Sequence, residues 1–168
     1  VVLPGPGGQK YAFLRGWDRF ETAGNSATSE DLPLDGDLLI VVDTCTWEQL
    51  DGLRSLVEHY RDRILVVDHH QTRDDLRHQE LVDVDAAAAG QIVMRLFEVR
   101  GVSITPTMAE SLFVSLVSDT GWFRFPNVTP EVYQKAATLE QLGANPPRIY
   151  EQIFQSETLA KLKLIREA

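Results

Sequence analysis

The sequence lacks disulfide partners, a long apolar run and an excess of positive charge, and each absence excludes a class of protein. Its single cysteine, Cys45, rules out an internal disulfide and a cysteine-rich zinc site within these 168 residues. This usage fits a reducing compartment, so we expect a cytoplasmic protein. No apolar run is long enough to span a bilayer, and Val1 begins no basic stretch followed by an apolar one.

Positive charge is scarce relative to negative charge. Sixteen Lys and Arg residues stand against 25 Asp and Glu residues, which gives a formal net charge of -9 at pH 7. Such a surface repels phosphate backbones and anionic membranes, so we expect neither a long nucleic acid nor a membrane as partner. The length and the 43% hydrophobic content suffice for one compact domain with a sizeable core.

The apolar pattern predicts an α/β fold with a Rossmann-like parallel sheet flanked by helices. Two runs rich in branched residues, 38–43 and 64–68, fit strands that are buried on both faces of a parallel sheet. A strand, a helix and a second strand in this order form a right-handed unit. A third strand is expected at 81–84, helices at 47–60, 86–99, 105–119, 130–142 and 157–165, and a helix breaker at 143–147.

Acidic and imidazole side chains follow the two long predicted strands. Asp43 ends the first, and Asp68-His69-His70 end the second, at the edge where open α/β sheets bind ligands. Carboxylates with neutral imidazoles suit a divalent transition metal such as manganese, whereas magnesium rarely takes histidine. Asp43 alone is better explained as a cap of the following helix. Three adjacent donors at 68–70 favour a metal site.

A third element, Asp119-Thr120-Gly121-Trp122-Phe123, places an acid at the end of an apolar helix. A helix terminus with a turn-forming glycine and a metal-binding carboxylate explain this element equally well. Arg124 has the planar guanidinium that reaches phosphates, and a surface salt bridge is an equal alternative. We expect Cys45 to be a small buried side chain rather than a nucleophile.

These three elements, in this order, resemble the DHH family of phosphoesterases. The family includes the single-strand exonuclease RecJ, family II inorganic pyrophosphatases and bifunctional oligoribonuclease/pAp phosphatases. The resemblance implies that Asp43 bridges two manganese ions and that His69 and Asp119 are further metal ligands, with magnesium as the alternative metal. It also implies a catalytic role for His70 beside the substrate phosphate, with Asp68 supporting the imidazoles.

Segments 11–14 and 119–125 are most similar to the oligoribonuclease/pAp phosphatase branch. The resemblance therefore implies manganese-dependent hydrolysis of short oligoribonucleotides or of 3′-phosphoadenosine 5′-phosphate (pAp) by a two-metal mechanism. Arg124 is the candidate substrate-binding residue. One alternative is an inorganic pyrophosphatase or exopolyphosphatase that uses the same site. Another is a catalytically inactive regulatory or binding domain, and a homodimer is left open.

Two features of the family have no counterpart in the sequence. The His-x-x-x-Asp-x-Asp type motif that ends the family's first strand is missing, because the region before Tyr11 contains no Asp or His. The C-terminal substrate-binding domain is missing as well. We therefore expect residues 1–156 to form a DHH domain without its first strand and motif, and residues 157–168 to begin a linker helix.

Overall fold

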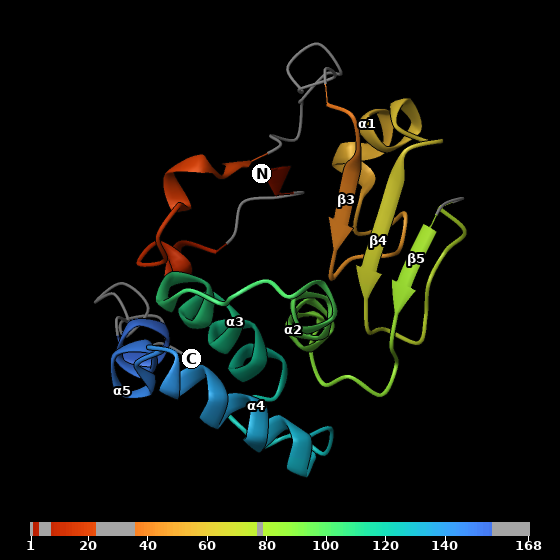
Figure 1. Cartoon of the computed structure of the whole chain (residues 1–168). Coiled ribbons are helices and arrows are strands. Elements are labelled where there is room, and N and C mark those ends of the chain that lie inside the picture. Colours follow the sequence, from red (N-terminus) through yellow and green to blue (C-terminus); the bar gives the residue numbers. More distant parts are fainter. Residues whose placement is uncertain (1, 4–7, 23–35, 77–78, 156–168) are drawn as a thin grey trace, which may run out of the picture.

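A three-stranded parallel sheet forms one half of the molecule (Figure 1). The structure is a computed structural model that describes residues 2–3, 8–22, 36–76 and 79–155. The strand order is β3-β4-β5, with β3 at Leu39–Val42, β4 at Ile64–Asp68 and β5 at Gln79–Val82. α1 (Arg54–His59) covers one face, and α2 (Ala89–Arg100) covers the other. The α/β class and the parallel sheet flanked by helices are confirmed.

The other half consists of helices that pack on α2 directly or through α3. They are α3 (Pro106–Asp119), α4 (Pro130–Gln141) and α5 (Pro146–Tyr150), which continues into a π-helical turn at Glu151–Gln155. Two short parallel strands, β1 (Val2–Leu3) and β2 (Glu21–Thr22), and 3-10 turns at Gln9–Tyr11 and Trp17–Arg19 precede the sheet. Among the described residues, no helix is both long and apolar enough to cross a bilayer.

Each half has its own hydrophobic core. The sheet packs on both of its faces, because successive side chains of a strand point to opposite faces. On the α1 side, β4 contributes Ile64 and Val66, while Leu65 and Val67 face α2. The helical half is centred on the buried side chains of Met94, Phe113, Leu116, Val132, Leu139 and Ile149. α2 joins the two halves, because Met94 packs in the helical core while Ile92 packs against the α2-facing side of the sheet.

α2 begins three residues later than the alanine run predicts. Ala88 is extended, with φ −159°, and the helix starts at Ala89. The preceding residues bond to side chains instead of continuing the helix: Ala86 O accepts from His69 Nδ1 at 3.1 Å, and Ala87 N donates to Gln91 Oε1 at 2.6 Å. Tertiary hydrogen bonds therefore override the helix propensity of alanine here. The non-helical residues Ala86–Ala87 are called the alanine strap below.

The helix expected over 47–60 is shorter than predicted. A 3-10 turn at Asp51–Leu53 leads into α1, which ends at His59. Gly52 is a poor helix former, and the Thr46 hydroxyl accepts a hydrogen bond from the Gln49 amide at 3.4 Å, which favours a turn.

Two further boundaries differ from prediction. The strand expected at 81–84 lies at 79–82, because the Asp83 carboxylate accepts a hydrogen bond from the Asp85 amide and ends the strand in a turn. The expected breaker at 143–147 contains the start of α5, where Asn145 caps the helix by accepting from Arg148 N at 3.0 Å. The helix expected at 157–165 lies outside the described residues.

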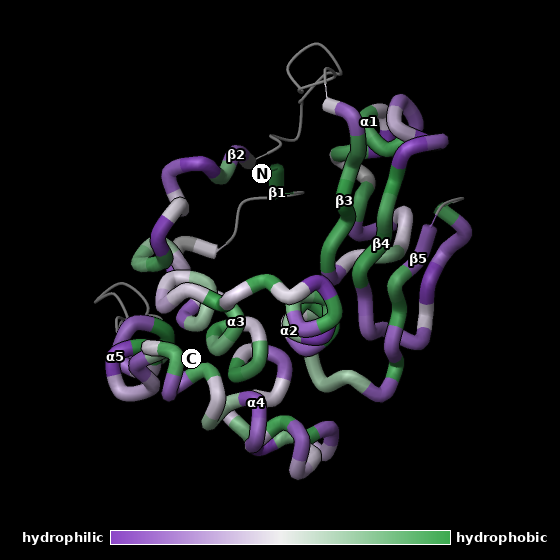
Figure 2. Tube along the Cα trace, in the orientation of Figure 1, coloured by the Kyte–Doolittle hydropathy of each residue, from purple (hydrophilic) through white to green (hydrophobic). Residues whose placement is uncertain are grey.

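β3 differs most from its prediction, because one of its faces is uncovered. Figure 2 shows β3 as a continuous hydrophobic segment. Val41 is buried under α1, but the side chains on the opposite face are about half exposed: Leu38 50%, Ile40 54% and Val42 48%. In the described part of the chain, β4 is the one strand that pairs with β3. A hollow of about 350 Å³ also lies against β3, lined by Val2, Tyr60 and residues of β3 and α1.

Candidate metal centre

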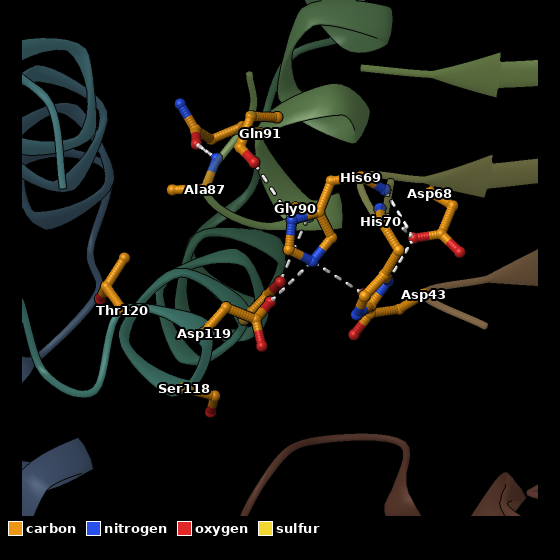
Figure 3. Close-up of polar contacts among 12 residues, drawn as sticks. Asp43, Asp68, His69, His70, Ala87, Gly90, Gln91, Ser118, Asp119 and Thr120 are labelled. Carbon is orange, nitrogen blue, oxygen red and sulfur yellow. Dashed lines mark hydrogen bonds and ion pairs between the residues drawn. The ribbon is translucent and has the colours of Figure 1, made fainter. Parts of the chain in front are cut away.

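The polar side chains at the strand ends converge on the end of α3 (Figure 3). His69 Nε2 lies 3.3 Å from Asp43 Oδ1 and 3.9 Å from Asp119 Oδ2. Asp43, Asp68, His69 and His70 each offer a ligand atom within 4.8 Å of the others. The structure thus brings together the three predicted metal ligands, Asp43, His69 and Asp119, and the two predicted catalytic residues, Asp68 and His70, at the ends of β3, β4 and α3.

Asp43 occupies a strained position just beyond β3. Its amide continues the ladder by donating to Val67 O at 2.9 Å, but its φ is +58°, which costs a non-glycine residue roughly 1–2 kcal/mol. Its Oδ1 is buried and has no hydrogen-bond partner among the described residues. Capping, the better reading of Asp43 alone, is therefore wrong. Such an oxygen next to an imidazole is suited to a cation.

His69 has a fixed tautomer. Its Nδ1 lies 3.1 Å from the carbonyl oxygen of Ala86, which is an acceptor, so Nδ1 carries the proton. The lone pair of Nε2 is then free to face Asp43 and Asp119. A histidine that donates one ring N–H to a backbone carbonyl is a typical metal ligand.

Asp68 supports both histidines from a fully buried position. Its Oδ1 accepts from His69 N at 2.6 Å, from His70 N at 3.0 Å and from His70 Nδ1 at 2.7 Å. Burial opposes ionisation of this carboxyl, but hydrogen bonds from Cys45, His70 and His69 outweigh burial and lower its pKa. The Asp68 carboxylate is therefore charged and fixes the turn that carries the imidazoles.

His70 is the more exposed imidazole, with 48% of its side chain accessible. The hydrogen bond from its Nδ1 to Asp68 raises its pKa, against the smaller effect of burial, and the charges of Asp68, Asp43 and Asp119 add to the rise. A histidine with this shift carries a proton more often at neutral pH. It can donate a hydrogen bond to a phosphoryl oxygen or a proton to a leaving group.

Asp119 is presented by a tight turn centred on Thr120, which is completely buried. The Thr120 hydroxyl donates to Leu116 O at 2.7 Å and accepts from Phe123 N at 3.2 Å. Gly121 has φ +54°, and a Cβ there would lie 2.5 Å from the Phe125 ring. This Asp-Thr-Gly sequence therefore ends α3 abruptly and fixes the carboxylate at its end.

Asp43 and Asp119 repel each other and are partly dehydrated. Burial raises the pKa of Asp43, and burial together with the charge of Asp43 raises the pKa of Asp119 to about 6. The buried, unpartnered oxygen of Asp43, the oriented Nε2 of His69 and the second carboxylate fit a divalent transition metal. Asp43, His69 and Asp119 would hold such an ion, which would remove the repulsion between the carboxylates.

Manganese affinity is predicted to fall as the pH drops through about 6. The metal requires an ionised Asp119, whose pKa is about 6, so protons compete with the metal below that value. We expect a level affinity above about pH 7 and a loss of roughly tenfold per pH unit well below 6. Titration calorimetry with Mn²⁺ between about pH 5 and pH 8 measures this dependence. An affinity that stays constant down to pH 5 would contradict it.

Two other sequence expectations concern residues beside the centre. Cys45 is 2% exposed, and burial together with Asp68 raises the pKa of its thiol to about 12, so it is a buried side chain as predicted. Arg124 is exposed, and its Nε donates to the carbonyl oxygen of Gly121 at 2.8 Å. A role in substrate binding stays a prediction.

The sequence patterns did not identify the residues that surround the ligands. These are the alanine strap, Gln91, which is 2% exposed, and Asn127, whose Nδ2 donates to Ala87 O at 3.2 Å and to Asp119 O at 3.1 Å. A run of alanines predicts a helix, and the hydrophobic periodicity of a sequence gives no indication of what an isolated Gln or Asn contacts. These contacts join segments that are distant in the sequence.

Known proteins resemble this chain in sequence and in fold. The bifunctional oligoribonuclease and PAP phosphatase NrnA of Thermus thermophilus is 32% identical over 124 residues, which cover 74% of this chain and 36% of that protein. A manganese-dependent inorganic pyrophosphatase of Methanothrix thermoacetophila is 25% identical over 63% of this chain and 35% of its own length. The chain spans little more than a third of the curated relatives it matches. No family model matches.

A solved structure extends the similarity to nearly the whole chain. An exopolyphosphatase-related protein from Bacteroides fragilis superposes with a TM-score of 0.88 over 99% of this chain and 50% of its own, at 19% identity. At that identity the likeness concerns the fold.

Proposed function

Because the chain belongs with the DHH-family phosphoesterases, we propose that the protein hydrolyses phosphoester bonds in short oligoribonucleotides or in pAp. The observation that carries the proposal is the convergence of Asp43, His69 and Asp119 around one point, with a buried carboxylate oxygen that lacks a hydrogen bond. The acidic net charge of -9 is consistent with a short substrate, because a long polyanion would be repelled.

Each residue of the centre has a role in this proposal. A divalent metal ion would be held by Asp43, His69 and Asp119. We propose manganese as this ion, with magnesium as the alternative. The metal ions, two in the complete enzyme, supply an activated water and neutralise charge on the phosphoryl oxygens. His70 donates a hydrogen bond to the phosphate or a proton to the leaving oxygen, and Asp68 keeps it oriented and protonated. Arg124 is proposed to bind a phosphate of the substrate.

We propose that further ligands come from a strand outside these 168 residues that lies against β3. The unpaired edge of β3 supports this: in the described residues β4 is its one partner, although the apolar sequence of β3 is typical of an interior strand. Residues 1–156 would then be a DHH domain without its first strand and motif. A linker helix from 157 would lead to a substrate-binding domain. We also propose a cytoplasmic location and leave a homodimer open.

Two alternatives are tested by the same experiment. Inorganic pyrophosphatase or exopolyphosphatase activity is favoured by the manganese-dependent pyrophosphatase relative and by the name of the Bacteroides neighbour. A regulatory domain without activity is the third reading, and it would keep the fold without a complete set of ligands.

The test compares Mn²⁺-dependent hydrolysis of pAp, a short RNA and pyrophosphate by the protein with its native flanking sequence. We expect turnover of pAp and RNA but not of pyrophosphate, and near inactivity with weak manganese binding for residues 1–168 alone. Phosphate release from pyrophosphate but not from pAp would favour the pyrophosphatase. No turnover of any substrate, with a folded protein, would favour the regulatory domain.

A further inference from the structure

Asn127 lies between the two segments that orient His69 and Asp119. Its amide nitrogen Nδ2 donates to Ala87 O at 3.2 Å and to Asp119 O at 3.1 Å. Both partners are carbonyl oxygens, which accept hydrogen bonds and do not donate them. The amide must therefore turn its nitrogen toward them, so its orientation is determined by the contacts themselves.

Each of these carbonyls belongs to a segment that controls a ligand. Ala87 is part of the alanine strap, and its neighbour Ala86 accepts the hydrogen bond that fixes the His69 ring. Asp119 is the last residue of α3. Asn127 therefore ties Ala87, the residue next to the hydrogen-bond partner of His69, to the backbone of Asp119. The side chains of His69 and Asp119 lie 3.9 Å apart.

The other half of the amide argues against a role in packing alone. Asn127 Oδ1 is buried and has no hydrogen-bond partner among the described residues. A buried acceptor without a partner lowers stability, and a leucine of similar size would avoid that loss. The two hydrogen bonds that Nδ2 donates explain why an amide serves this position.

We infer that Asn127 is a positioning residue of the metal centre, which sets the separation of the His69 imidazole and the Asp119 carboxylate. It acts through the alanine strap and the end of α3, without contact to the metal or the substrate. The inference rests on the proposed metal site but on no particular substrate. Partners that orient metal ligands typically change metal affinity about 10- to 100-fold when they are replaced.

The experiment replaces Asn127 by Leu or Asp in the protein with its native flanking sequence. Leu removes the unpaired oxygen but leaves the Ala87 and Asp119 carbonyls without this donor, so we expect the melting temperature with chelator to fall by about 2–8 °C. Mn²⁺ affinity, measured by calorimetry, is expected to fall at least about tenfold. The Asn127→Asp variant cannot donate to either carbonyl, and we expect a similar loss of affinity from it.

Asn145 provides a matched control, because it is an asparagine that caps α5 by accepting from Arg148 N. Asn145→Ala should lower the melting temperature and leave Mn²⁺ affinity unchanged. If Asn127→Leu does not fold, the Mn²⁺ affinity of Asn127→Asp tests the inference instead. The visible absorption spectrum of the Co²⁺ complex of Asn127→Asp should also differ from that of the wild type.

Each remaining outcome overturns a different statement. Wild-type Mn²⁺ affinity and an unchanged Co²⁺ spectrum in the variants, with or without lower melting temperatures, would show that Asn127 serves stability alone. A wild-type protein that binds no Mn²⁺ would overturn the metal site and the proposed function, and the inference about Asn127 with them.

Discussion

In the protein with its native flanking sequence, replacing Asp43 by Asn should strongly weaken metal binding and hydrolysis while leaving the fold intact. The position has φ +58°, and asparagine adopts such left-handed conformations more readily than other non-glycine residues. The substitution keeps the shape of the side chain and removes the charge that a cation requires. We expect Mn²⁺ affinity to fall about 100-fold or more. Hydrolysis should fall by roughly 10³-fold, equivalent to about 4 kcal/mol of transition-state stabilisation.

Calorimetry with Mn²⁺, substrate turnover and melting with chelator separate these effects. The melting temperature should not decrease, because burial raises the pKa of Asp43 and its charge is unfavourable in the metal-free chain. Asp43→Ala is the matched comparison: it removes the same charge but places alanine at φ +58°, so it should melt lower than Asp43→Asn. Normal Mn²⁺ affinity in Asp43→Asn would remove this carboxylate from the proposed site.

Asp119→Asn should have opposite effects on stability and on metal binding. The pKa of Asp119 is about 6 in the folded chain, above the ordinary value of 3.8 for an aspartate, so the folded state holds this proton more tightly than the unfolded state. Stability is therefore lost as the pH rises from about 4 through 6, and the loss is complete at neutral pH. Removing the charge should restore about 1–2 kcal/mol at pH 7.5.

We expect the metal-free Asp119→Asn variant to melt about 2–6 °C higher than the wild type at pH 7.5. Near pH 4 the two proteins should have the same melting temperature. Saturating Mn²⁺ should raise the melting temperature of the wild type but not of the variant. Asp62→Asn, on an exposed turn after α1, is the control and should change neither quantity. A variant that melts lower than the wild type at pH 7.5, or that is still stabilised by Mn²⁺, would contradict the prediction.

The sequence predicts those parts of the molecule that local patterns determine. β4 and α3 lie where the apolar runs indicate, and Thr105 caps α3 by accepting from Met108 N at 3.3 Å. The convergence of Asp43 and His69 follows from the general geometry of parallel sheets, whose strand ends share one edge. Asp119 could be assigned to the site by the family resemblance, since its sequence alone fits a helix end equally well.

The remaining features depend on contacts between distant segments, which no local pattern records. Ala86 and Ala87 lie outside the helix because their backbone groups bond to His69, Gln91 and Asn127, although alanine favours a helix. Trp122 and Phe123 adopt φ +58° and +63°, which their side chains disfavour, because the turn after α3 packs them against Phe113. The exposed face of β3 could not be foreseen either, because its composition is that of an interior strand.

The metal centre spans two halves that have separate cores. Asp43 and His69 extend from the sheet, and Asp119 ends a helix of the other half. α2 packs both in the helical core and against one face of the sheet. An ion held by these ligands would be a cross-link between the halves, comparable to a disulfide that joins two subdomains. Substitutions deep in the helical core could then weaken metal binding without touching a ligand, and metal would make the two halves unfold as one cooperative unit.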